Sequence, residues 1–305
     1  MLPWLHPGEA FNDEDYEREG GFSVVKRYRI DPDSHGFHDL LKSVSLHAGF
    51  VAVKTLKKIK DPKDPMYHHD WRKEVNLLLR FSGMQHPYLV TLLATFTKND
   101  TNHLLFPCAE YDLDEFWEKK SGPLVEEGDI DLGHMQWVSE QIKGLTEALK
   151  FIHAPLRKDL DPSEMYGRHG DLKPENILWF ASPTDKRGIL VITDLGIAAV
   201  HREVSKSNIP NQDVPRTPGY RPPECDIKEG KISRAFDIWT IGCLFLEKAC
   251  WLLGGDDMRS EFAEGRLQTY QVTGAVTPIF FDIQKSEESG KCVLMVKESV
   301  TEVCI

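Results

Sequence analysis

The sequence has six cysteines in 305 residues but no C-x-x-C pair. Cysteines at that spacing are typical of structural zinc sites and of redox-active dithiols. His68 and His69 stand side by side, yet no second ligand pair follows at zinc spacing. The sequence therefore predicts reduced thiols, mostly in the core, in an intracellular protein of the cytoplasm or nucleus.

An excess of basic residues is also missing. Lysine and arginine total 37, against 48 aspartates and glutamates, which gives a formal net charge of −11 at pH 7. A general nucleic-acid binder needs a basic surface to neutralise phosphates. We therefore expect no nucleic acid among the partners.

Hydrophobic targeting and spanning segments are missing as well. The first residues, MLPWLHPGEAFNDEDYERE, lack the basic start and the apolar run of a secretory signal. The longest apolar stretch, residues 238–255, carries Glu247 and Lys248 in its middle, where charge is costly in lipid. The sequence predicts a buried helix there and no membrane partner.

What the chain does have is enough apolar surface for a large core, at 41% hydrophobic residues. Residues 20–30 and 49–58 alternate polar residues with Val, Phe and Tyr, which predicts two neighbouring antiparallel strands with an inserted loop between them. Residues 88–96 and 103–110 have the same strand character. A helix with one apolar face is predicted over residues 68–81, between the strand at residues 49–58 and the one at residues 88–96.

The pattern changes further along the chain. Apolar residues then recur at alternating three- and four-residue spacing, which predicts a well-buried helix, at Met135, Val138, Ile142, Leu145, Leu149 and Ile152. We predict an α+β chain of two lobes. Residues 1–14 form an N-terminal tail, residues 15–109 a small antiparallel β lobe with one helix, and residues 110–305 a mainly helical lobe whose C-terminal end is incomplete.

One lysine is placed to hold a polyphosphate. Lys54 is flanked by apolar strand residues in FVAVKTL, so its ammonium would leave a packed sheet for a cleft, where a carboxylate must hold it. Glu74, on the predicted helix, is the natural partner, although Asp70 lies one turn earlier on the same face. Taken alone, Lys54 would be an ordinary edge-strand lysine that points to water, so the other motifs decide its interpretation.

A second segment, HGDLKPEN, supplies groups that phosphoryl transfer from ATP requires. Asp171 is a carboxylate that can accept or orient a hydroxyl proton. Lys173 is an ammonium for the transferring phosphate, and Asn176 is an amide for a metal ion. Asp194 follows at the end of a β-branched run, just before a Leu-Gly pair, which suits a metal ligand at a strand-to-loop junction.

The chain resembles the eukaryotic protein kinase family through six motifs in one order: VAVK, a helix glutamate, HxDLKPEN, DLG, TPGYRPPE and DIWTIGC. The resemblance covers roughly residues 15 to 255. It implies a bilobal protein-kinase-like fold and an ion pair between Lys54 and Glu74. It also implies that Asp171 is the catalytic base and that Mg²⁺ is bound by Asn176 and Asp194.

Lys173 in DLKPEN and Thr217 in RTPGYRPPE resemble the serine/threonine branch of the family. The chain is also similar to filamentous-fungal protein-kinase-domain proteins with HGD-type catalytic loops. The resemblance implies ATP and Mg²⁺ as cofactors, a protein substrate, and a hinge at HLLFPCAEYDL, where Phe106 guards a deep pocket. The implied nucleotide contacts are Gly20, Gly21, Val25, Ala52, Lys54, Phe106, Pro107, Ala109 and Asp194.

The glycine-rich loop departs from the family pattern. G-x-G-x-x-G-x-V becomes REGGFSVV, with Arg18, Gly20, Ser23 and Val25 at the four specified places. Arg18 and Ser23 add side chains where the backbone should approach the phosphates closely. This predicts slow turnover.

Three further features concern the second lobe. Asp237 in RAFDIW resembles the family's buried aspartate, which braces the catalytic loop through backbone N–H groups. The glutamate equivalent to Glu224 pairs in the family with an arginine of the last helices. No arginine follows Arg266 here, so we expect Glu224 to lack that partner and apolar surface to be exposed. The acidic residues after the hinge would suit either a preference for basic substrates or, as the favoured interpretation, a solvated helix start, at Asp112, Asp114, Glu115 and Glu118.

Gly170 leaves the reaction class open when it is considered alone. Many protein kinases have an arginine there that binds a phosphate on the activation segment, so we expect activity not to depend on phosphorylation through that contact. Small-molecule kinases of the aminoglycoside or choline type have a similar HGD loop. Three functions follow from the sequence: a serine/threonine protein kinase, a catalytically weak scaffold module of the same fold, and a small-molecule kinase. The segment RTPGYRPPE favours the first.

Overall fold

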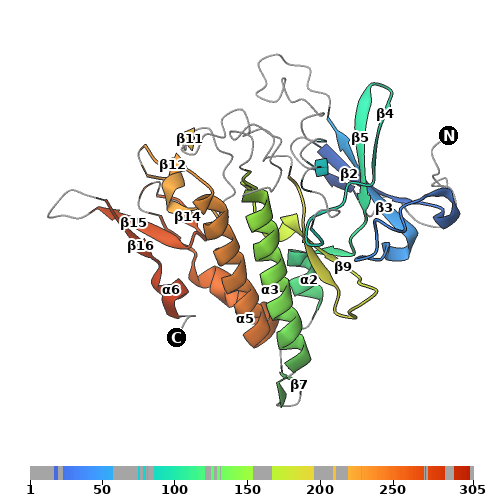
Figure 1. The fold of residues 1–305 in the computed structure, drawn as a ribbon. Helices are drawn as coiled ribbons and strands as arrows, with labels where there is room; N and C mark the ends of the chain where they lie inside the picture. The colour runs from blue at the N-terminus through green and yellow to red at the C-terminus, as the bar shows by residue number, and fades with distance from the viewer. Residues whose placement is uncertain are drawn as a thin grey trace. The chain divides into compact units, whose positions relative to one another are not determined.

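The computed structural model describes residues 17–19, 23–57, 75, 78–79, 81, 86–120, 125–126, 129–130, 132–153, 167–195, 209–210, 219–227, 229–270, 272, 274–285 and 292–302. The chain folds into two compact units (Figure 1). The first comprises residues 1–113, 143–152 and 176–200, and the second comprises the rest. The predicted lobe bounds stay a prediction. The sites predicted at Gly20, Gly21, Glu74 and Thr217 lie outside the described residues.

The first unit contains a five-stranded antiparallel sheet in the order β1-β2-β3-β5-β4. Its strands are β1 (Glu17–Glu19), β2 (Ser23–Arg29), β3 (Phe50–Leu56), β4 (Ala94–Lys98) and β5 (Thr101–Pro107). β3 lies in the middle, and its side chains Val51 and Val53 are buried. The insertion between β2 and β3 contains two short 3-10 turns, η2 (Pro32–Ser34) and η3 (His47–Gly49). The antiparallel strands predicted in residues 20–30 and 49–58 are confirmed as β2 and β3.

The register of this sheet determines which side chains share a face. Arg18 is opposite Val25, and Val25 is opposite Lys54. Directly opposed residues of antiparallel strands point to the same side, and so do residues two apart along a strand. Ala52, which pairs with Phe106, therefore belongs to the same face. We call this surface, made by Arg18, Val25, Ala52, Lys54 and Phe106, the Lys54 face.

A three-stranded sheet in the order β10-β9-β6 completes the described strands of the first unit. Its strands are β6 (Tyr111–Asp112), β9 (Ile177–Phe180) and β10 (Ile189–Ile192). The β-branched and aliphatic residues of β10 suit a buried strand, and Ile192 is fully buried. Ile192 also bridges to Leu89 in parallel, and the N–H of Val90 donates to the Ile192 carbonyl at 2.9 Å. These bonds fix the strand that leads to Asp194.

Helix α3 (Leu132–His153) confirms the helix that the apolar spacing from Met135 to Ile152 predicts. Its residues 143–152 belong to the first unit and the others to the second. Val138, Leu145, Leu149 and Ile152 are buried, as expected. The prediction was wrong for Met135, which is 45% exposed. The buried stripe begins instead at Trp137, because the large indole gains more from burial than the thioether side chain.

The second unit is built on α5 (Ala235–Gly265), which confirms the buried helix predicted at residues 238–255. The helix is interrupted at Gly254 and Gly255, which have non-helical backbone angles. Glu247 and Lys248, in its middle, are buried. Helix α2 (Leu113–Lys119) belongs to the second unit from Asp114 on. Within the part of the chain that the structure describes, no helix combines the length and apolarity needed to cross a membrane.

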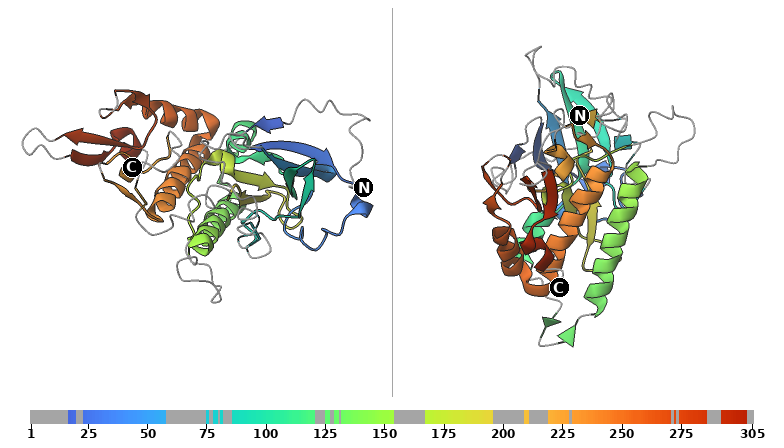
Figure 2. Two further views of the ribbon diagram at one scale, coloured as in Figure 1. Left: turned by 90° about the horizontal axis from the view of Figure 1, so that it is seen from above. Right: turned by 90° about the vertical axis from the view of Figure 1, so that its left-hand side faces the viewer.

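The remaining described elements are short. They are β7 (Val125–Glu126), β8 (Asp129–Ile130), η5 (Pro174–Asn176), β11 (Ile209–Pro210), η8 (Pro223–Cys225), β12 (Lys231–Ile232), β13 (Gln268–Thr269), β14 (Val276–Thr277), β15 (Phe281–Lys285), β16 (Cys292–Val296) and α6 (Glu298–Thr301). Figure 2 shows the β15–β16 hairpin from two further directions. Tyr270, Ile279, Phe281 and Ile283 form a buried cluster there, with Trp239 of α5 packed against it.

The cysteines that the structure describes in side-chain detail are buried free thiols: Cys108, Cys225, Cys243 and Cys250. This confirms the prediction of core thiols for these four. In the hairpin, Val293, Leu294, Met295 and Val296 are each about half exposed. Beyond α5, the described residues form hairpins and one short helix, α6.

Candidate active site

The first unit brings Lys54 and Asp194 together, although they are 140 residues apart in the sequence. The Nζ atom of Lys54 donates to Oδ1 of Asp194 at 3.1 Å. Lys54 follows the buried Val53 in β3, and its own side chain is only 16% exposed. The carboxylate is more open, at 39%. The result is a fixed cation beside an accessible carboxylate, and the pairing of Lys54 with Glu74 stays a prediction.

The backbone around Asp194 holds its carboxylate in place. Asp194 has a φ of +58°, in the left-handed region that costs a non-glycine residue about 1 kcal/mol. Hydrogen bonds on the preceding residues offset this strain, because the N–H of Ile192 donates to the Tyr88 carbonyl at 2.9 Å and that of Thr193 to the Asn176 carbonyl at 3.0 Å. Leu195, on the other side, is fully buried. The position of the carboxylate is therefore set by the fold.

Asn176 lies beside the same strand-to-loop junction, through its carbonyl bond to Thr193. Its side chain is buried, at 7% exposure. Carboxylate and amide oxygens are ligands that Mg²⁺ accepts, so the chemistry of Asn176 and Asp194 fits the ion that the resemblance implies. Among the described residues, no group of three or more His, Cys, Asp or Glu side chains could hold a metal ion. An ion here would need water or phosphate oxygens as further ligands.

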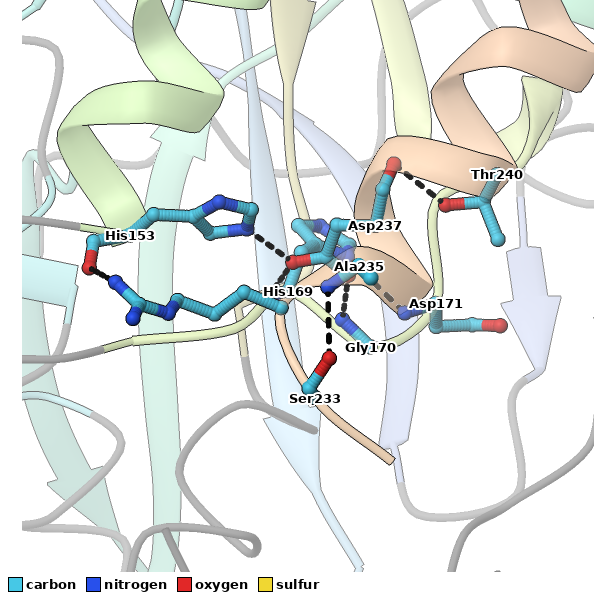
Figure 3. Close-up of polar contacts among 9 residues, drawn as sticks. His153, His169, Gly170, Asp171, Ser233, Ala235, Asp237 and Thr240 are labelled. Carbon is cyan, nitrogen blue, oxygen red and sulfur yellow. Dashed lines mark hydrogen bonds and ion pairs between the residues drawn. The ribbon is translucent and has the colours of Figure 1, made fainter. Parts of the chain in front are cut away.

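The second unit contains the catalytic-loop residues, held by Asp237 (Figure 3). Asp237 is fully buried, and its carboxylate accepts hydrogen bonds from the N–H groups of His169 and Gly170, each at 2.8 Å. This confirms the predicted brace. Nε2 of His153, at the end of α3, lies 2.7 Å from the same carboxylate. The sequence reasoning missed His153, whose position in FIH at the helix end was the available signal.

The braced loop turns at Gly170, which has a φ of +82° and so suits glycine. The N–H of Asp171 donates to Nδ1 of the buried His169 at 3.3 Å, and Leu172 is buried. Asp171 and Lys173 lie on either side of Leu172, with Nζ of Lys173 3.3 Å from Oδ2 of Asp171. Their side chains are 12% and 25% exposed. A carboxylate and an ammonium thus stand together on a rigid loop.

The hinge predicted at HLLFPCAEYDL includes the end of β5 and the residues that come directly after it. Phe106 lies on the Lys54 face, and Pro107 pairs with Val51 at the last position of the strand. Pro107 has no N–H, so only its carbonyl can bond to a ligand. Cys108 is buried, and burial raises the pKa of its thiol to about 11, while the positive charges of Arg27 and Arg18 act in the opposite direction. Arg18 is therefore close enough to influence the hinge electrostatically.

An ion pair between Arg18 and Asp112 was not predicted from the sequence. The guanidinium of Arg18, on β1, contacts the carboxylate of Asp112, on β6. Asp112 is only 4% exposed, so its assignment to a solvated acidic helix start was wrong. The physical reason is that Asp112 precedes α2 and is buried against a cation, whereas Asp114 and Glu115 are in the first turn of that helix. The sequence signal for this ion pair was Arg18 itself, a basic residue at a position where the family pattern has glycine.

A hydrogen bond to the buried Glu247 anchors Tyr220 to α5. Oη of Tyr220 donates to Oε2 of Glu247 at 2.6 Å, and Nη2 of Arg266 donates to Oε1 at 2.5 Å. The Arg266 guanidinium also lies 4.1 Å from the ring centres of Phe262 and Phe280. Burial raises the pKa of Tyr220, and the carboxylate of Glu247 adds to this effect. Tyr220 therefore remains a neutral hydrogen-bond donor.

Glu224 lies near a different arginine from the one that the family places there. Burial raises the pKa of its carboxyl group, and the charge of Arg168 opposes this effect. Arg168 stands two residues before Gly170, and its guanidinium lies 5.5 Å from the ring centre of Phe236. Burial lowers the pKa of Arg168, opposed by Asp237, Cys225 and Glu224. We expected Glu224 to lack the arginine with which it pairs in the family. The structure adds that Arg168 supplies positive charge to Glu224.

Comparison with known proteins identifies the family. The protein kinase domain family matches residues 42–275. Human cyclin-dependent kinase-like 4 is 30% identical over 201 residues, which cover 65% of this chain and 43% of that protein. The serine/threonine-protein kinase SSN3 of Coccidioides immitis is 25% identical over 199 residues, covering 65% and 38%. Cyclin-dependent kinase 8 of Caenorhabditis elegans is 28% identical over 178 residues, covering 55% and 27%. The chain spans less than half the length of these relatives, and it belongs to the eukaryotic protein kinase superfamily, with the bilobal α+β fold of that family.

Proposed function

We propose that this chain is a serine/threonine protein kinase that uses ATP and Mg²⁺ to phosphorylate hydroxyl groups of protein substrates. The observation that carries the proposal is the ion pair between Lys54 and Asp194. A cation that binds inner phosphates must stand beside the carboxylate that holds the metal, because both neutralise the same polyphosphate. The fold fixes both groups, since Lys54 leaves the central strand and Asp194 is held by the bonds of its neighbours.

The residues of the catalytic loop have separate roles in the proposed reaction. Asp171 orients the acceptor hydroxyl and takes its proton, and Lys173 neutralises charge on the phosphoryl group as it moves. Their separation of 3.3 Å supports these roles. Asn176 and Asp194 would hold Mg²⁺, which supplies further positive charge at the phosphates when it is bound. Asp237 is a positioning residue, because it holds the backbone of the loop and not the substrate.

The Lys54 face supports a nucleotide site in the first unit. Val25 and Ala52 offer apolar contact from neighbouring strands, and Phe106 lies on the same face. In the proposed site, the adenine base contacts backbone groups of Pro107 and Ala109. Gly20 and Gly21 belong to the loop that would cover the phosphates, and Glu74 would complete the ion pair of the active state.

The acceptor class and the cellular location are also part of the proposal. The relative SSN3 is a serine/threonine-protein kinase by name, and the HGDLKPEN and RTPGYRPPE segments agree with that branch. The anchoring of Tyr220 to Glu247 supports a fixed segment that a peptide could bind against. We place the protein inside the cell, in the cytoplasm or nucleus, with protein substrates and without nucleic-acid or membrane partners.

A scaffold module with weak catalysis is the second candidate. One observation favours it: Arg18 occupies a glycine position and is bound to Asp112 beside the hinge. Such a module would keep the fold and bind partners without efficient turnover. The acceptor test below separates this candidate from an active kinase.

The test is a panel of acceptors with one enzyme preparation. Purified protein is incubated with Mg²⁺ and ATP labelled in the terminal phosphate, and with three acceptors: a mixed Ser/Thr peptide library, a Tyr peptide library, and a mixture of choline and aminoglycosides. Autophosphorylation is measured in the absence of acceptors. We expect label on Ser/Thr peptides, and none on the small alcohols.

Three results would redirect the proposal. Transfer to choline or an aminoglycoside alone would identify a small-molecule kinase. Binding of MgATP without any transfer, seen as a rise of melting temperature with nucleotide, would favour the scaffold module. Transfer to tyrosine peptides alone would contradict the proposed serine/threonine specificity.

A further inference from the structure

Arg18 belongs to the face of the sheet on which the proposed nucleotide lies. The register places it opposite Val25, which is itself opposite Lys54. All three side chains therefore leave the sheet on the same side. The next residue, Glu19, leaves on the other side, and its Oε1 atom accepts from Nζ of Lys57 at 2.7 Å. The two charged residues of β1 thus have separate ion pairs on opposite faces.

The Arg18 side chain crosses from the sheet to the segment that follows the hinge. Its guanidinium binds the carboxylate of Asp112, which is 94 residues away in the sequence. Asp112 stands three residues after Ala109, the last of the proposed adenine contacts. The effect of the Arg18 charge on the pKa of the hinge thiol Cys108 agrees with this position. The ion pair therefore joins the two segments between which a nucleotide would have to enter.

The pair is more than a loose surface contact. The Asp112 side chain is 4% exposed, and that of Arg18 is 37% exposed. A guanidinium bound to a buried carboxylate is held by charge and by directed hydrogen bonds, so separating the two costs free energy. The closed arrangement is therefore favoured in the protein without nucleotide.

We propose that the ion pair of Arg18 and Asp112 is a latch across the nucleotide site, which must open before adenosine or ATP can bind. This inference rests on the proposed function, because the position of the nucleotide comes from it. Since only the open fraction of molecules binds, the latch raises the apparent dissociation constant in proportion to the closed fraction. Arg18 thereby determines nucleotide affinity, independently of the residues that carry out phosphoryl transfer.

The experiment compares two ligands and two single variants by isothermal titration calorimetry. Arg18→Gly removes the latch and restores the residue type of the family pattern. Glu19→Gln is the matched control, because it breaks the neighbouring ion pair on the opposite face. The ligands are MgATP and adenosine, which has no phosphates. Melting temperatures verify that each variant is folded.

We expect Arg18→Gly to bind both ligands about tenfold more tightly, which corresponds to a latch closed in roughly nine molecules of ten. Glu19→Gln should bind both like the wild type. Equal gains for adenosine and MgATP are the signature of a latch, since opening it helps any ligand that uses the base and ribose region. Arg18→Gln, which keeps much of the side-chain length without the charge, is the second variant if glycine unfolds β1, and should change the affinities in the same direction.

Three results would overturn the inference. Unchanged affinities in Arg18→Gly would show that the pair does not control entry. Weaker MgATP binding with unchanged adenosine binding would show that Arg18 is a phosphate contact. If wild type and variants all bind neither ligand, the latch and the proposed function fall together, whereas wild-type binding without a gain in the Arg18 variants refutes the latch alone.

Discussion

The Nζ atom of Lys248 lies 5.0 Å from the ring centre of Trp137, inside the second unit. The ring centre of Trp251 is 5.5 Å away. The side chain is 2% exposed, and its Nζ forms no hydrogen bond within the described part of the chain. Burial lowers the pKa of this lysine to about 7. The faces of aromatic rings attract an ammonium group, but they do not replace the water that hydrates it. The charged form of Lys248 is therefore disfavoured in the fold.

This lysine should make stability depend on pH. Its folded pKa lies below the unfolded value of 10.5, so between about pH 7 and pH 10 the unfolded chain holds a proton that the native chain has released. The free energy of unfolding therefore rises with pH across that window. Below the window the penalty is fully present, and it is on the order of 3–5 kcal/mol.

Lys248→Met tests this relationship. The variant should be more stable than the wild type at pH 7 by about 2 kcal/mol or more, because a thioether of similar length needs no proton and packs between the indoles. The difference should shrink toward pH 10. Urea unfolding at pH 7, 8, 9 and 10 measures this difference in unfolding free energy. The same difference at every pH would contradict the lowered pKa of Lys248.

Loss of the Lys54 ammonium should stop turnover while leaving the fold intact. Lys54→Met removes the cation beside Asp194, and we expect phosphorylation to fall by roughly 100-fold or more. The unfolding free energy should change by only about 1 kcal/mol, because the Asp194 carboxylate is partly solvated.

Lys57→Met is the matched control for this change. Lys57 follows the same strand and has its own carboxylate partner, Glu19, on the opposite face of the sheet. It should retain wild-type activity. Equal activity losses in both variants would indicate a general effect on the sheet and not a role for Lys54.

Removal of the Asp237 charge should loosen the catalytic loop. In Asp237→Asn, an NH2 group replaces one of the two carboxylate oxygens. His169 and Gly170 donate to different oxygens of Asp237, and an NH2 group donates and does not accept, so one of the two N–H groups loses its acceptor. We expect a loss of about 3 kcal/mol of stability and a fall in peptide phosphorylation. Asp256→Asn is the control on the same helix, since its carboxylate bonds to Arg259 at a partly exposed position. Unchanged activity of Asp237→Asn would refute the bracing role.

Gly170 predicts how activity responds to dephosphorylation. Because the loop has a glycine with a φ of +82° where an arginine could bind a phosphate, the kinase should not need phosphate on its activation segment through that contact. Treatment with a protein phosphatase should therefore change peptide phosphorylation by less than about twofold. Mass spectrometry of the treated protein verifies that phosphate has been removed. A large loss of activity would contradict the prediction.

The sequence predicted those features that depend on short-range patterns. Helix α3 was found because its apolar spacing repeats over about five turns, and β3 because apolar residues flank Lys54 in a short run. The brace at Asp237 followed from a motif. Asp194 was placed at a strand end from the β-branched residues before it, and the structure adds that it contacts Lys54.

Features that depend on packing between distant segments were missed. The Arg18–Asp112 pair joins residues 94 apart, and no local pattern distinguishes a solvated aspartate from one that a remote strand buries. Lys248 was recognised as incompatible with lipid, but its enclosure by Trp137 and Trp251 depends on how two helices pack. Met135 was assigned to the core because periodicity does not weigh the size of the neighbouring Trp137.

The most direct test of the proposed function is the rate of peptide phosphorylation in Asp171→Asn relative to wild type, at MgATP concentrations that saturate both. The substitution keeps the size of the side chain and the backbone bond to His169, but it removes the proton acceptor. We predict a rate lower by roughly 100-fold or more, with an unchanged affinity for MgATP. Equal rates in the two proteins would contradict the assignment of Asp171 as the catalytic base and, with it, the proposed kinase mechanism.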